Sequence, residues 1–97
     1  MDKNKQIQNI VTSYIEANNL SNRRLVDEIN DQLGDPSAIT IGAVGYWRSG
    51  KSLPRPFLIE VLYQRADGPT KEFALDLLKV LKPDEYDNGR QNSANEL

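Results

Sequence analysis

Apolar side chains recur along this chain at the spacing of amphipathic helices, and no segment alternates convincingly between apolar and polar residues as a strand would. The first apolar stripe lies within residues 5–18 at offsets of 0, 3, 4, 7 and 8, and two asparagines end it. A second helix is expected from about Asn22 to Leu33, with Ser21 as its N-cap and Gly34 as its C-terminal stop.

A third helix is expected from Thr40 to Ser49, after a turn at residues 35–37. Thr40 can cap this helix, and Gly50 ends it. Its inward positions recur every three residues and are predicted to be Ile41, Val44 and Trp47.

Two glycines inside the third helix need an explanation. Gly42 and Gly45 each weaken a helix by roughly 1 kcal/mol relative to alanine. Close packing against another helix would explain them, and so would the close approach of a large partner on that side.

Two more helices are expected beyond the linker at residues 53–56, whose prolines pre-set the start of the fourth helix. The buried stripe of the fourth helix is predicted to be Phe57, Leu58, Val61 and Leu62. Residues 67–69 break that helix, and Thr70 is the predicted cap of the fifth. The apolar stripe of the fifth helix is Phe73, Ala74, Leu77, Leu78 and Leu81.

These elements predict an all-α fold, a compact bundle of about five short helices that contains a helix-turn-helix. The 97 residues suit a single domain, which we assign to residues 1–82. Pro83 stops the last helix, and the polar residues 83–97 are predicted to form a disordered tail.

The composition excludes several kinds of chemistry. The chain has no cysteine and no histidine, which removes disulfides, thiolate catalysis, the usual general base and the usual zinc ligand. We therefore predict no enzyme activity, no cofactor, no metal and no small-molecule substrate. No apolar run approaches the ~20 residues of a membrane span, so we expect a cytoplasmic protein that does not bind membranes.

Charge is distributed unevenly along the chain. The net charge is −2, yet no acidic residue lies between Asp35 and Glu60. Within that interval Arg48, Lys51 and Arg55 supply three positive charges. A basic segment inside an acidic chain favours a polyanionic partner.

One interpretation of this basic segment is a phosphate-binding loop, because residues 45–52 match G-x-x-x-x-G-K-[ST] letter for letter. That motif needs a strand before it and a helix that begins at its end. Pro54 and Pro56 fall in the first turn and a half of that helix, where an interior proline costs about 3 kcal/mol. Nucleotide binding through this loop is therefore the least favoured interpretation.

The favoured interpretation is that the third helix enters the major groove of double-stranded DNA. The predicted base or groove contacts are the outward residues Thr40, Gly42, Ala43, Tyr46 and Arg48. The predicted phosphate contacts are Asn22, Arg23, Lys51 and Arg55. When bound to DNA, the protein would be associated with the nucleoid.

Two segments resemble the repressor/Cro-type (XRE-like) helix-turn-helix family of bacteria and their phages. Residues 20–26, Leu-Ser-Asn-Arg-Arg-Leu-Val, are similar to the opening of the family's first motif helix. Residues 44–50, Val-Gly-Tyr-Trp-Arg-Ser-Gly, followed by proline, resemble its recognition helix and exit. The resemblance covers roughly residues 7–81 and implies a five-helix fold, a transcriptional regulator such as a repressor, and a homodimer on a near-palindromic operator.

The chain departs from the family pattern between the two motif helices. The family has a small residue in the first motif helix and a glycine in the turn, where this chain has Val26 and Asn30. The connection is also about eight residues longer than usual. A helix-turn-helix domain used for protein–protein contacts is therefore kept as the alternative, which the negative net charge favours.

Overall fold

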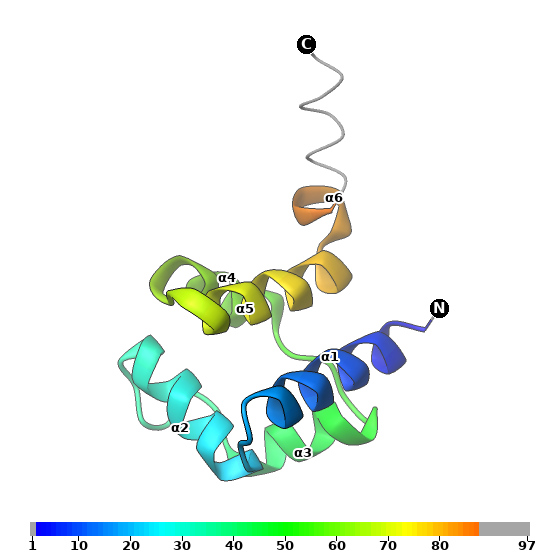
Figure 1. Ribbon diagram of the computed structural model, residues 1–97. Helices are drawn as coiled ribbons and strands as arrows, with labels where there is room; N and C mark the ends of the chain where they lie inside the picture. The colour runs from blue at the N-terminus through cyan, green and yellow to red at the C-terminus, as the bar shows by residue number, and fades with distance from the viewer. Residues whose placement is uncertain (1, 88–97) are drawn as a thin grey trace.

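The structure is a computed structural model that describes residues 2–87. These residues form six helices and no strand (Figure 1), so the predicted all-α class is confirmed with one helix more than expected. The helices are α1 (Lys3–Ala17), α2 (Asn22–Leu33), α3 (Ile41–Ser49), α4 (Pro56–Arg65), α5 (Gly68–Leu81) and α6 (Pro83–Tyr86). No helix within residues 2–87 is both long and apolar enough to cross a membrane.

The helices pack so that α1 lies between α3 and α5. In Figure 1, α3 runs along the lower edge of the molecule, and α4 and α5 lie on the far side of α1. The side chain of Asn4 donates a hydrogen bond to the carbonyl of Gly50 at 2.9 Å, which ties the start of α1 to the end of α3. α3 also packs against α2, and Gly42, Tyr46 and Ser49 on the opposite side of α3 are exposed.

A single apolar core joins α1 to α5. Its fully buried side chains include Ile7 of α1, Leu25 of α2, Val44 of α3 and Leu77 of α5. Trp47 is 4% exposed, which confirms its predicted place in the core. Every buried side-chain nitrogen and oxygen within residues 2–87 has a hydrogen-bond partner.

Two apolar residues that were predicted to be buried are exposed instead. Ile41 is 45% exposed, because Ile39, in the connection before α3, fills the core next to Val44. Phe57 is 75% exposed, because α4 turns Ile59 and Leu62 toward the core. Phe57 precedes Ile59 by two residues, and it therefore lies about 200° around the helix from it.

One buried amide organises the connection between α2 and α3, residues 34–40. Asn30 is 6% exposed, and its side-chain nitrogen donates to the carbonyls of Pro36 (2.9 Å) and Ile39 (3.1 Å). Its side-chain oxygen accepts the backbone N–H of Ile39 at 2.9 Å. Gly34, at a left-handed φ of 70°, ends α2 and turns the chain into this connection. These bonds fix the path of the connection and the point at which α3 begins.

The fifth helix begins earlier than predicted. It starts at Gly68 with Asp67 as its N-cap, because Pro69 falls in the first helical turn, where a missing N–H has no consequence. The hydroxyl of Thr70, the predicted cap, lies 3.1 Å from the Tyr14 hydroxyl and links α1 to α5.

The predicted disordered tail is wrong for residues 83–87, where α6 packs against α4. The ammonium of Lys82 and the hydroxyl of Tyr86 each lie 3.0 Å from the same carboxylate oxygen of Glu60. The Tyr86 ring also meets the Tyr63 ring edge-on, with centroids 6.0 Å apart. The rest of the predicted tail, residues 88–97, lies outside the described residues.

Asn30→Leu should lower the free energy of unfolding by roughly 2–4 kcal/mol, because it leaves the buried Ile39 N–H and the two carbonyls without partners. Urea unfolding followed by circular dichroism measures this change. Gln32→Leu, at an exposed position of the same helix, is the matched control and should change stability little. Equal effects of the two substitutions would contradict the role of the amide.

The contacts of Lys82 and Tyr86 with the Glu60 carboxylate should make the stability of the fold depend on pH. The carboxylate's hydrogen bond with Lys82, followed by that with Tyr86, holds the pKa of Glu60 below its ordinary value. A carboxylate with a lowered folded-state pKa stabilises the fold above its unfolded pKa of about 4.3, and this contribution is lost as the pH falls through the folded-state value. Thermal melts between pH 7 and 3 should therefore show a shallower acid decline for Glu60→Gln than for wild type. Glu16→Gln, on exposed α1 surface, is the control, and identical declines for Glu60→Gln and wild type would refute the prediction.

Candidate nucleic-acid interface

α3 is a short helix that is capped at both ends, and one of its sides is exposed. The Thr40 hydroxyl accepts the N–H of Ala43 at 3.2 Å and starts α3, and Gly50, at a φ of 77°, ends it. Val44 and Trp47 face the core. At 100° per residue, the positions opposite them are Gly42, Gly45, Tyr46 and Ser49.

The predicted base or groove contacts differ in how exposed they are. Thr40, Gly42 and Tyr46 are exposed, and the Tyr46 side chain is the largest feature of this face at 55% exposure. Ala43 is half-buried beside the core. Arg48 is half-buried as well, and it turns toward α2.

One flank of α3 meets the beginning of α2. The guanidinium of Arg48 donates to the side-chain oxygen of Asn22 at 2.8 Å. Ser21 caps α2 by accepting the N–H of Arg24 at 3.1 Å, and Arg23 is exposed in the same turn. The first N–H groups of any helix lack intrahelical acceptors and attract anions. The corner where α3 meets the start of α2 therefore offers a phosphate both the Arg48 guanidinium and the free N–H groups of α2.

The other flank of α3 meets the loop before α4. A hollow of about 250 Å³ lies there, and Tyr46, Leu53 and Arg55 are among the residues that line it. The exposed Lys51 follows the end of α3, and its N–H donates to the Tyr46 carbonyl at 2.9 Å. The predicted phosphate contacts therefore lie around α3, with Asn22 and Arg23 at the start of α2, Lys51 just beyond the C-terminal end of α3, and Arg55 in the loop before α4.

Neither close contacts nor backbone conformation within the protein require glycine at positions 42 and 45 of α3. A Cβ on Gly45 would meet no atom within 4 Å, and a Cβ on Gly42 would lie 3.7 Å from the Thr40 hydroxyl, an ordinary contact. Neither glycine has a positive φ. Close packing between helices therefore does not explain these glycines.

The phosphate-loop interpretation is wrong in its geometry. Residues 45–49 belong to α3, and no strand precedes them within residues 2–87. Lys51 follows the C-terminal end of α3, and α4 begins only at Pro56, so the helix N-terminus that a phosphate loop uses is missing next to Lys51.

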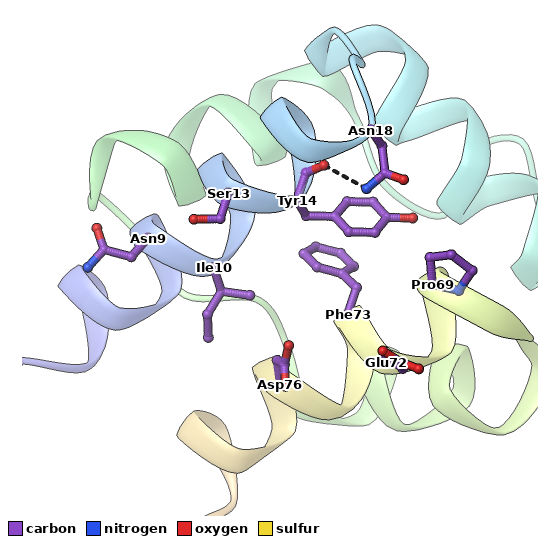
Figure 2. Close-up of a pocket in the computed structure, with 9 residues that line it drawn as sticks. All are labelled: Asn9, Ile10, Ser13, Tyr14, Asn18, Pro69, Glu72, Phe73 and Asp76. Carbon is purple, nitrogen blue, oxygen red and sulfur yellow. Dashed lines mark hydrogen bonds between the residues drawn. The ribbon is translucent and has the colours of Figure 1, made fainter.

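A groove of about 410 Å³ between α1 and α5 has a different character (Figure 2). The Tyr14 and Phe73 rings stack at its centre with centroids 4.2 Å apart, and burial raises the pKa of the Tyr14 hydroxyl. Glu72 and Asp76 line it, without any basic residue. The groove shares no residue with the exposed face of α3, and its carboxylates would repel phosphate. No cluster of three side chains able to hold a metal occurs in residues 2–87.

Sequence reasoning missed the exposure of three apolar residues, although the family resemblance places Ile41 among the DNA contacts. Ile41 lies in α3, Leu53 in the loop after it and Phe57 in the first turn of α4, and all three are exposed. Two of these could have been suspected, because another apolar residue stands two positions away from each: Ile39 from Ile41, and Ile59 from Phe57. In both pairs the isoleucine named first is buried and its neighbour is exposed. Which member of such a pair is buried depends on the packing of the whole fold.

Comparisons with protein-family models, with curated proteins and with solved structures found no match for this chain. The resemblance to the XRE-like helix-turn-helix family therefore remains a prediction that depends on residues 20–26 and 44–50.

Gly45→Ala should raise the free energy of unfolding by roughly 0.5–1 kcal/mol, because the site is helical and a methyl group meets nothing there. Gly50→Ala should lower it, because a left-handed φ strains any residue with a Cβ. Chemical unfolding of the two variants beside wild type measures both effects. Destabilisation by Gly45→Ala would contradict the open space that the structure shows around residue 45.

Proposed function

We propose that this chain is a sequence-specific double-stranded DNA-binding protein that regulates transcription, with α3 lying in the major groove. The observation that carries the proposal is the pair of glycines on the exposed face of α3, which have no reason within the fold. The major groove admits an α-helix, and glycine lets the helix backbone approach the bases closely.

The charges around α3 support this proposal. Arg48 and Arg23 on one flank, and Lys51 and Arg55 on the other, would meet the two phosphate backbones that border the groove. No acidic residue from 36 to 59 opposes them. The bond to Asn22 holds Arg48 at the start of α2, so we reassign Arg48 from a base contact to a phosphate contact.

A homodimer fits the same proposal. One recognition helix contacts few base pairs, and a second copy on a neighbouring half-site would add affinity and specificity. A bacterial or phage repressor of cytoplasmic, nucleoid-associated type is the form that the family resemblance favours.

A protein–protein role is the second candidate, and the exposed apolar residues favour it. Phe57, in the first turn of α4, is 75% exposed, and Leu53, in the loop after α3, is 37% exposed. Exposed apolar surface often marks a protein contact. DNA binding by the purified protein separates the two candidates.

Fluorescence anisotropy of labelled duplexes at several salt concentrations tests the proposal. The duplexes are a random one and one enriched by selection from a random library. Wild type should bind the selected duplex far more tightly, with an affinity that falls steeply as salt rises. Lys51→Ala and Arg48→Ala should each weaken binding to both duplexes and reduce the salt slope by about 1.

Lys79→Ala, which removes a lysine from the far side of the bundle on α5, is the matched control and should bind as wild type does. Absence of binding to any duplex at low salt would overturn the proposal and leave the protein–protein role ahead.

A further inference from the structure

The exposed face of α3 offers few hydrogen-bonding groups that are free to read bases. The Thr40 hydroxyl oxygen is used as the N-cap, and the Ser49 hydroxyl donates to the Tyr46 carbonyl at 3.2 Å. Arg48 is bonded to Asn22. The α3 sequence contains no Asn, Gln, Lys, Asp or Glu. Arg48 is therefore the one side chain of α3 that could make the paired hydrogen bonds that usually identify guanine, and its bond to Asn22 turns it toward α2 instead.

Apolar groups take their place on α3. Ile41 is 45% exposed at its start, and the Tyr46 ring is 55% exposed more than one turn later. The two glycines lie between them in the sequence and leave the backbone bare. On this face the apolar groups of Ile41 and Tyr46 project beyond the bare backbone at the two glycines, so they would be the first groups of α3 to reach the groove floor.

We infer that α3 selects its DNA site through apolar contact with thymine methyl groups, made chiefly by Ile41 and the ring of Tyr46. This inference rests on the proposed function and names the base chemistry that the same surface recognises. The C5-methyl group of thymine is the apolar group that the four standard base pairs present in the major groove. The preferred site should accordingly carry thymines on the strands that face these two residues.

Replacement of thymine by deoxyuridine tests the inference, because it removes the methyl group and leaves base pairing intact. Duplexes enriched from a random library by wild type are resynthesised with one thymine at a time replaced. Affinity should fall roughly fourfold for each methyl that α3 contacts, which corresponds to the burial of one carbon group. Replacements outside the protected footprint should have no effect.

Two variants assign the effect to its side chain. Ile41→Ala should lose sensitivity to deoxyuridine at one position of the site and keep it elsewhere. Leu53→Ala removes an exposed apolar residue outside α3 and should retain full sensitivity. Circular dichroism should be unchanged in both, because both residues are exposed.

The outcomes separate failure of the inference from failure of the proposed function. Enriched duplexes whose affinity does not respond to any deoxyuridine would overturn the thymine assignment and leave DNA binding in place. Enrichment of sites without thymine would do the same. Failure to enrich any duplex, together with no binding at low salt, would overturn both and indicate that a protein covers this face.

Discussion

The buried amide of Asn30 is the constraint on which the arrangement of the two central helices depends. A connection of seven residues between α2 and α3 could follow many paths, and an entropic cost attaches to fixing any one of them. Three hydrogen bonds from one side chain hold the backbone at Pro36 and Ile39. They bring Ile39 into the core, and this leaves the next isoleucine outside. The exposed apolar character of α3 is thus a consequence of how its entry is held.

The surface of α3 is defined as much by what surrounds it as by its own residues. Contacts with α1 and α2 bury Val44 and Trp47, and they orient the opposite face outward. The bond between Arg48 and Asn22 joins distant parts of the chain into one basic corner. The larger groove between α1 and α5 is lined by carboxylates, so size alone would point to the wrong surface for a polyanion.

The sequence was sufficient for features that depend on local chemistry. Ser21, Gly34, Thr40 and Gly50 are found at the helix ends where their capping chemistry placed them, because a cap is decided by a few neighbouring residues. The interval without acidic residues was also evident from the sequence alone. The features that the sequence failed to predict depend on contacts between residues far apart in the chain.

The position of Phe57 depends on how α4 packs, and the order of residues 83–87 depends on a carboxylate more than twenty residues earlier. The partner of Arg48 lies on another helix and could not be read from spacing. The role of Asn30 was visible only as a departure from a family pattern. Its hydrogen bonds needed the folded connection to be recognised.

The hydrogen bond between Asn4 and Gly50 has a practical consequence for anyone who handles this protein. Asp2 caps α1, and two residues later Asn4 holds the exit of α3, so the beginning of the described chain lies beside the C-terminal end of the helix that we propose binds DNA. A purification tag or fluorescent protein fused ahead of Asp2 would stand where a nucleic-acid strand is expected to pass. In Figure 1, α6 lies on the side of the molecule away from α3.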